Sequence, residues 1–480
     1  MLGPHRLPCE TPEAQKPGEA EAGNTRWVLP TAILGSSIGF IDGSVVNVAL
    51  PEMQRSLEAS LGAMQWTING YMLTLASLIL LGGAAGDRFG RGRVFTIGLV
   101  GFALASLACG LAPSVPWLIA ARLAQGAAAA LLTPSSLAII GAAFSGEERG
   151  AAIGKWAAAA ALTTALGPPL GGWLVDTIGW RSIFFINLPI SAAALLLAMK
   201  LPPDRDPKRS EPLDAFGALF AILSLGLLSY GLIALGERTG VWGAAAVVAA
   251  VPAAWLFIQT EARASWPLMP LSLFRDSDFR GANTLTVVLY AALGGALFLL
   301  PFMLIRVHGY SAMAAGAAFL PFSVIMGLGS SWAGGLVERF GSRPPLVVGP
   351  LVTAVGFAIL GFSGSDPNYW KGFLPGMVVL GVGMTITVAP LTTTVLNSAP
   401  GEMSGTASGI NNAAARTGGL IAIAALGLAF GGVGAADLGI DALADAYRVV
   451  MYVAAAVTGI SALIAMLSIR SRRLASSARP

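Results

Sequence analysis

Charged side chains are scarce in this chain of 480 residues, at 11% of the sequence. A typical soluble domain carries roughly 25% charged residues, whereas apolar residues make up 55% of this chain. A water-soluble protein with so few charges could not cover its surface, but a protein whose surface faces lipid has no such need. The composition therefore indicates an integral membrane protein.

Cysteine and histidine are almost absent. Cys9 lies far from Cys109 in the sequence, and His5 lies far from His308. We therefore expect no disulfide, no metal site and no cofactor. No acidic cluster indicates a catalytic site, and no Walker motif indicates ATP use, so the chain is predicted not to be an enzyme.

Long, continuous apolar runs fill most of the chain. Only helices or closed barrels can cross a bilayer, and runs without alternation indicate helices. Because a crossing takes about 20 residues, we predict an all-α membrane protein with about fourteen transmembrane helices. The predicted spans are 27–50, 64–85, 94–112, 115–140, 152–175, 182–200, 213–236, 241–261, 281–304, 312–336, 345–363, 370–396, 405–431 and 447–469.

The Lys and Arg residues are concentrated in alternate loops, which sets the predicted orientation. This pattern predicts that both termini are cytoplasmic and explains the net charge of +4 without any role in nucleic-acid binding. Residues 1–26, rich in Pro, Glu, Gly and Ala, are predicted to be a disordered tail, and residues 470–480 a basic tail. The first apolar run, from Trp27, is too long for a signal peptide, so we interpret it as a retained span.

A short segment occurs twice. Gly86-Asp87-Arg88-Phe89-Gly90 is similar to Val337-Glu338-Arg339-Phe340-Gly341, and the same spacing maps Gly167 onto Gly418. We therefore predict two six-helix halves, at 27–200 and 281–469, with two extra spans in a linker at 201–280. Two related halves with a site at their interface is an architecture of transporters.

One acidic residue, Asp42, lies within the first span, in the segment Ile41–Pro51. An ionisable group at membrane depth is costly and is by default a functional candidate. Such a carboxyl could alternate between carrying a proton and pairing with a cation. The alternative is a structural Asp near the outer mouth, hydrogen-bonded to Ser44 or Asn47.

Arg122 lies within span four, in the segment Arg122-Leu123-Ala124-Gln125-Gly126. A buried arginine stays protonated and needs a partner, unless it extends to the membrane interface. Span five holds Gly167-Pro168-Pro169-Leu170-Gly171-Gly172, in which the prolines would bend the helix and the glycines would allow tight packing. The segment Gly82–Arg93 combines glycines with Asp87, which could cap a helix, and arginines that could pair across the two halves.

Together these segments resemble the major facilitator superfamily, in particular its fourteen-span drug:proton antiporter family. The resemblance runs from Trp27 to the last span, and the segments at 180–189, 261–275 and 408–419 fit it too. In span five Thr163 stands where the fuller family pattern has a glycine. The resemblance implies proton coupling by Asp42 and Arg122. It implies a conformational latch at Gly83, Asp87, Arg88, Gly90, Arg91, Glu338 and Arg339, and an antiporter motif at Gly154, Gly167, Pro168, Gly171 and Gly172. For the latch the alternative is a basic anchor alone, and for the motif a plain helix kink.

Several aromatic and polar residues are candidates for a substrate cavity. Aromatic rings could stack on flat amphipathic ligands or on cations, or they could be lipid-facing or packing residues. Polar side chains within apolar runs could face the cavity or join two helices. The candidates are Asn47, Trp66, Tyr71, Trp156, Tyr290, Phe298, Asn412 and Arg416.

The predicted function is proton-coupled export of hydrophobic or amphipathic drugs, antibiotics or biocidal dyes by alternating access. Export of an endogenous metabolite is the alternative, and proton-coupled nutrient uptake is a weaker one. The expected location is the inner membrane of a bacterium, as a multi-pass protein. The expected partners are the lipid bilayer, protons and a small-molecule substrate, with a periplasmic adaptor left open.

Overall fold

The computed structural model describes residues 25–202, 213–237, 240–429 and 439–470. All regular secondary structure in these ranges is helical, which confirms the predicted fold class. Thirteen helices of the described part are long and apolar enough to cross a membrane. Most of the two predicted tails, at 1–26 and 470–480, lies outside the described residues.

The helices follow the predicted spans closely. The first group comprises α2 (Val28–Ser56), α3 (Leu61–Phe89), α4 (Arg91–Gly110), α5 (Val115–Ala143), α6 (Gly146–Thr177), α7 (Ser182–Phe185) and α8 (Asn187–Ala198). Next come α9 (Ala215–Gly236), α10 (Val241–Arg263) and the short η1 (Leu271–Arg275). The last group comprises α11 (Ser277–Phe302), η2 (Met303–Val307), α12 (Ala312–Ala317), α13 (Leu320–Gly334), α14 (Leu336–Phe340), α15 (Arg343–Ser363), α16 (Tyr369–Gly372), α17 (Leu374–Asn397), η3 (Gly401–Met403), α18 (Ser404–Ala429) and α19 (Ile440–Ser468).

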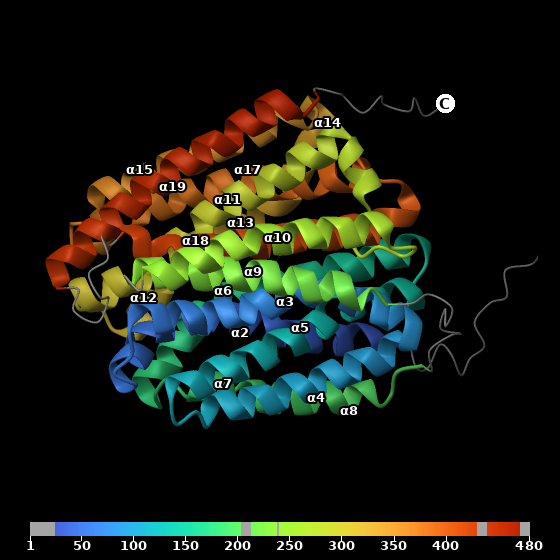
Figure 1. The fold of residues 1–480 in the computed structure, drawn as a ribbon, viewed down its shortest axis with the longest axis horizontal. Helices are drawn as coiled ribbons and strands as arrows, with labels where there is room; N and C mark the ends of the chain where they lie inside the picture. The colour runs from blue at the N-terminus through green and yellow to red at the C-terminus, as the bar shows by residue number, and fades with distance from the viewer. Residues whose placement is uncertain (1–24, 203–212, 238–239, 430–438, 471–480) are drawn as a thin grey trace, which may run out of the picture.

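Figure 1 shows the helices lying side by side along one direction, in two bundles. The bundle of α2–α8 occupies the lower part of the view and the bundle of α11–α19 the upper part. The inserted helices α9 and α10 lie between them on the near side, where α9 contacts both α3 and α18. Helix α2 begins and α19 ends at the right, which we call the terminus end; the other is the opposite end.

Some predicted spans differ from the structure, including the one at 370–396, which is divided into α16 and α17. The span predicted at 182–200 is divided into α7 and α8, because Pro189 lacks the N–H that a continuous helix would donate to the carbonyl of Phe185. The span predicted at 312–336 is divided among α12, α13 and α14. The last span, predicted at 447–469, begins earlier in the structure, because α19 starts at Ile440.

The repeated loop segments have the same local structure. Gly90 ends α3 with φ 100°, and Gly341 ends α14 with φ 81°. Only glycine adopts such angles without strain, and it is the usual residue beyond a helix C-terminus. The two copies therefore form equivalent turns, after α3 in one bundle and after α14 in the other.

Polar contacts join the two bundles near the opposite end. Arg306 donates to Gln54 at 3.1 Å, and the Asp176 carboxylate accepts from the backbone N–H of Ala312 at 3.0 Å and of Met313 at 2.8 Å. On the side of α9, Gln65 and Asn69 of α3 donate to backbone carbonyls of α18, at 2.7 and 3.3 Å. These side-chain hydrogen bonds between the two bundles all lie in the half of the molecule at the opposite end.

A buried charge pair as the candidate functional site

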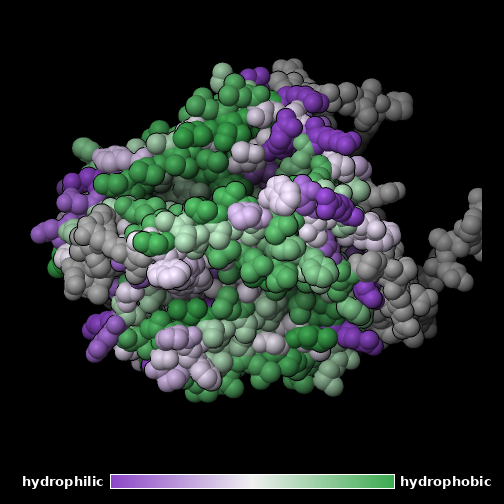
Figure 2. All heavy atoms as spheres, viewed as in Figure 1, coloured by the Kyte–Doolittle hydropathy of each residue, from purple (hydrophilic) through white to green (hydrophobic). Residues whose placement is uncertain are grey.

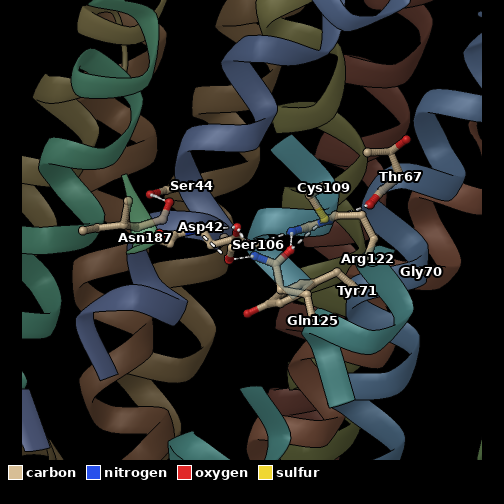
Figure 3. Close-up of polar contacts among 12 residues, drawn as sticks. Asp42, Ser44, Thr67, Gly70, Tyr71, Ser106, Cys109, Arg122, Gln125 and Asn187 are labelled. Atoms are coloured by element: carbon tan, nitrogen blue, oxygen red, sulfur yellow. Dashed lines mark hydrogen bonds and ion pairs between the residues drawn. The ribbon is translucent and has the colours of Figure 1, made fainter. Parts of the chain in front are cut away.

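Asp42 and Arg122 form an ion pair in the interior of the first bundle. Asp42 is 0% exposed and Arg122 is 1% exposed, and Arg122 Nη1 lies 2.5 Å from Asp42 Oδ2. The pair joins the middle of α2 to the first third of α5, and Figure 3 shows the contact. Arg122 therefore does not extend to the membrane interface, and its partner is the carboxylate of the first span.

Polar side chains surround the carboxylate and all of them donate to it. Gln125 Nε2 donates to Asp42 Oδ1 at 2.8 Å, and Asn187 Nδ2 of α8 donates to the same oxygen at 3.3 Å. Both amides also donate to Ser106 Oγ of α4, at 2.8 and 3.3 Å. Because both carboxylate oxygens face donors, the arrangement suits ionised Asp42. Asp42 is not hydrogen-bonded to Ser44 or Asn47, since both of these bond to the backbone of their own helix.

Arg122 has contacts on every side of its guanidinium. Its Nε donates to the carbonyl of Thr67 at 3.0 Å, and Nη1 donates to Gln125 Oε1 at 2.6 Å. The group also lies over the ring of Tyr71, 4.3 Å from its centroid, and 5.9 Å from that of Phe184. An aromatic face attracts a desolvated cation, so the ring of Tyr71 helps to hold the charge.

Glycines let the helices come close enough to build this network. A Cβ on Gly126 would overlap the carbonyl of Tyr71 and the hydroxyl of Thr74, and a Cβ on Gly82 would overlap the carbonyl of Ala130. These close approaches pack α5 directly on α3. Arg122 lies one helical turn before Gly126, which brings its guanidinium to the carbonyl of Thr67 on α3.

The two buried charges of the pair depend on each other. Two opposite charges in a dry interior are stable only together, because either one alone keeps the full cost of leaving water. A proton that binds Asp42 would remove its charge and leave Arg122 without a counter-ion. The arrangement can therefore convert one protonation event into a change of helix packing.

The glycines and prolines of α6 lie at the junction between Asp42's helix and the second bundle. Cβ atoms on Gly167 and Gly171 would overlap Ser44 and Val45 of α2. A Cβ on Gly172 would overlap the backbone of Ala312 in α12. Pro168 lies inside α6. A Cβ on Gly316 of α12 would overlap the carbonyl of Pro168, so the two helices are in close contact there. Gly154 has open space around it. This segment of α6 thus packs on α2 and on the other bundle at once.

The residues predicted as a latch lie at the terminus end. Asp87 Oδ1 accepts from Arg91 at 2.9 Å, and Arg91 Nη1 also donates to the carbonyl of Ala138 in α5 at 3.2 Å. Arg91 thus bonds within its own bundle in this conformation. The helix that follows, α4, has Gly90 at its N-cap position, and no side-chain hydrogen bond caps its N-terminus. Asp87 therefore does not cap α4. A Cβ on Gly83 would be in ordinary van der Waals contact with Pro134 of α5. Arg88 lies over the ring of Phe89, while Glu338 and Arg339 are exposed on α14.

The predicted cavity residues fall into different environments. Tyr71 is 3% exposed and Phe298 is 1% exposed, so packing occupies both rings. Trp156 is half-buried, donates to Ser36 Oγ at 2.8 Å and packs against Phe40. The half-buried residues of this set also include Asn47, Trp66, Tyr290 and Arg416, while Asn412 is exposed.

A comparison with known protein families identifies the architecture. The family model described as Major Facilitator Superfamily matches residues 32–423, which is most of the chain. The chain belongs to the Major Facilitator Superfamily.

Curated relatives within the Major Facilitator Superfamily cover most of the chain. A multidrug resistance protein, Stp, from Mycobacterium tuberculosis is 38% identical over 82% of this chain and 74% of its own length. The tetracenomycin C resistance and export protein of Streptomyces glaucescens is 34% identical over 86% of this chain and 78% of its own length. The methylenomycin A resistance protein of Bacillus subtilis is 36% identical over 84% of this chain and 86% of its own length.

Solved structures show the same fold at low identity. A D-xylose-proton symporter matches with a TM-score of 0.67 at 15% identity, covering 93% of this chain and 98% of its own. A bacterial homologue of the human lysosomal transporter Spinster, in an inward-facing state, matches with a TM-score of 0.66 at 18% identity. The match covers 93% of this chain and 97% of that structure. These structures show the fold, and the family match and the curated relatives show that the chain is a multi-pass membrane transporter of the superfamily.

The sequence did not single out three members of the site in this superfamily fold. Gln125, Asn187 and Ser106 each make hydrogen bonds in the network around Asp42. The available signal was their polarity within apolar runs, and the placement of Gln125 one turn after Arg122. Polarity alone does not separate them from the many Ser and Thr side chains that bond to their own helix.

Proposed function

We propose that this chain is a proton-coupled antiporter of the fourteen-span type that exports hydrophobic or amphipathic small molecules, such as antibiotics and biocidal dyes. The buried pair of Asp42 and Arg122 is the observation that carries the proton coupling. The relatives named for antibiotic resistance or export support the direction and the substrate class. The glycine and proline segment of α6 also supports antiport, because it joins the pair's helix to the second bundle.

The orientation of the cycle follows from the basic loops. With the terminus end in the cytoplasm of a bacterial cell, the contacts of Asp176 and Arg306 close the external side. Substrate then enters from the cytoplasm or the inner leaflet. Rocking of the two bundles opens the external side. A proton that reaches Asp42 from there dissolves its pair with Arg122, and substrate leaves outward.

The charges near the site favour neutral and anionic substrates. Arg122 neutralises Asp42, and the other acidic residues of the described part lie in loops or near helix ends. Arg416 of α18 is within electrostatic reach of the Tyr71 and Tyr290 hydroxyls and has no ion-pair partner among the described residues. A cation would therefore enter a region of positive charge, whereas an acidic aromatic molecule would be attracted.

Inside-out vesicles from cells that express the protein test this function. Respiration acidifies the lumen, and a quenched acridine dye reports the pH gradient. An antiporter exchanges added substrate for luminal protons, so fluorescence should recover; a symporter would carry protons inward and deepen the quench. We expect recovery with anionic or neutral aromatic antibiotics, and weaker recovery with ethidium. Vesicles without the protein are the control. If none of these compounds gives more fluorescence recovery than in the control vesicles, the result contradicts the proposal.

A further inference from the structure

Three arginines line a surface pocket at the terminus end of the second bundle, away from the buried charge pair. The pocket, of about 590 Å³, lies where α11 and α15 begin and α19 ends. Arg280 is in the first turn of α11, Arg343 is the first residue of α15, and Arg470 follows α19. Helix α19 contacts both other helices, and a Cβ on Gly281 of α11 would overlap Ser468 of α19. This packing brings the arginines together, in what we call the basic pocket.

Two of these arginines have no acidic partner. Arg280 donates to the backbone carbonyl of Phe274 at 3.3 Å, which leaves its charge in place. Neither Arg280 nor Arg343 has an ion-pair partner within the described part of the chain. A guanidinium group offers five N–H donors, so most donors of these two side chains are available to a ligand.

Two carboxylates beside the basic pocket are engaged by backbone groups. Asp276 Oδ1 accepts from the backbone N–H of Asp278 at 2.8 Å and of Phe279 at 3.0 Å, which caps α11. Asp278 Oδ1 accepts from the backbone N–H of Arg470 at 2.7 Å. The side chain of Arg470 is 3.9 Å from Asp276 Oδ2, a long contact at an exposed site. Because three arginines face two carboxylates, the pocket keeps a positive charge.

An apolar stripe leads from the basic pocket along the outside of α19. Leu467 lines the pocket and is 83% exposed. Leu463 and Ile460 are 56% and 51% exposed, and this spacing places all three on one face of the helix. Figure 2 shows hydrophilic side chains gathered at this end of the second bundle, beside an apolar outer surface. A charged pocket and a lipid-facing stripe are therefore continuous.

The length of α19 places the basic pocket at the depth of lipid headgroups. The helix has 29 residues and is therefore about 44 Å long. A bilayer with its headgroup regions is about 40–45 Å thick. Both ends of α19 thus reach the headgroups, and the basic pocket lies at one of these ends.

We propose that the basic pocket binds the phosphate headgroup of an anionic phospholipid, whose acyl chain lies along the stripe on α19. Phosphate oxygens accept two parallel bonds from one guanidinium group, which suits a pocket built from arginines. A zwitterionic headgroup would bring a second positive charge and is disfavoured. A lipid that bonds to Arg280 and Arg343 ties α11 to α15 across the end of α19. Only the choice of the cytoplasmic leaflet rests on the proposed function.

Binding of defined lipids to the purified, delipidated protein in detergent tests the site. The probes are phosphatidylglycerol and phosphatidylcholine with the same acyl chains, and glycerol phosphate, which has the anionic group without the chains. Native mass spectrometry gives the dissociation constant of the first bound lipid, and thermal unfolding gives its effect on stability. We expect phosphatidylglycerol to bind at least tenfold more tightly than phosphatidylcholine and to raise the unfolding temperature.

Two results of this comparison would overturn the proposal. The first is equal affinity for the two lipids, which would show that the charge of the headgroup is not recognised. The second is stabilisation by glycerol phosphate as large as that by phosphatidylglycerol at the same concentration, which would indicate a site for free phosphate. Added NaCl should weaken the binding of phosphatidylglycerol more than that of phosphatidylcholine, because salt screens exposed charges.

Variants of the arginines locate the bound lipid. Arg343→Gln should weaken the binding of phosphatidylglycerol about fivefold, the effect of one basic residue near an anionic lipid surface. Replacing Arg280, Arg343 and Arg470 together by Gln should lower the affinity to that for phosphatidylcholine. Arg263→Gln is the matched control, because Arg263 is exposed at the end of α10, outside the pocket. Wild-type affinity in the triple variant, or an equal loss in the control, would refute this location.

Matched charges on two exposed apolar residues give a second test of the location. Leu467→Glu places a negative charge at the basic pocket and should weaken the binding of phosphatidylglycerol. Met199→Glu adds the same charge to a residue of the first bundle that is 78% exposed, and should leave binding unchanged. Equal affinity of the two variants would contradict the proposal. These measurements need neither substrate nor proton gradient, so a failure here is distinct from a failure of proton-coupled export in vesicles.

Discussion

Replacing Asp42 with asparagine should destabilise the protein by about 3–5 kcal/mol, the usual cost of breaking a buried ion pair by removing one partner. The side chain keeps its shape, but Arg122 stays charged and 1% exposed, without a counter-ion. Its other contacts, to the carbonyl of Thr67 and the ring of Tyr71, hold it in place and do not neutralise it.

No orientation of the new amide satisfies its neighbours. Arg122 donates to one carboxylate oxygen, and Gln125 and Asn187 donate to the other. An asparagine offers one oxygen and one NH₂ group, so a donor always meets a donor. Gln125 cannot rotate its amide to help, because its own oxygen accepts from Arg122 at 2.6 Å.

The assay is thermal or denaturant unfolding of purified protein in detergent. The single variant Asp42→Asn should unfold well before the wild type, and the double variant Asp42→Asn, Arg122→Gln should recover much of the loss, because no charge then remains buried. If the single variant is as stable as the wild type, or if the double variant is less stable than the single one, the reasoning from the charge pair is refuted.

Three further changes test other parts of the structure. Gly172→Val should disrupt the packing of α6 on Ala312, so that a cysteine probe placed at the opposite end becomes more reactive than in the wild type; equal reactivity would argue against that contact. Asp176→Ala removes a carboxylate that accepts from two backbone N–H groups at the start of α12, and should weaken the same closure by about 1 kcal/mol in that cysteine assay. Gly90→Ala should cost about 1–2 kcal/mol in thermal unfolding because φ is 100°, whereas Gly154→Ala, with open space around it, should cost nothing; similar losses in both would contradict the turn assignment.

Much of the fold could be predicted because membrane spans are long and apolar. The repeated loop was visible in the sequence for a physical reason, since both copies need a glycine with positive φ at Gly90 and Gly341. Asp42 and Arg122 stood out because single charges are conspicuous in apolar runs. The divided span at 182–200 was missed, although Pro189 was a local signal for it.

The partners within the site could not be read from the sequence. The pairing of Asp42 with Arg122 depends on how α5 packs against α2 and α3, which long-range contacts decide. Tyr71 was a candidate for substrate contact, but the structure shows its ring against Arg122.

The most direct test of the account separates substrate exchange from proton coupling in proteoliposomes. Wild type and Asp42→Asn, each checked for folding by size-exclusion chromatography, are assayed for exchange of labelled substrate without a gradient and for accumulation under an imposed pH gradient. The account predicts that the wild type does both, whereas the variant exchanges substrate and does not accumulate it. Accumulation by the variant at the wild-type level would contradict the claim that Asp42 couples protons to export.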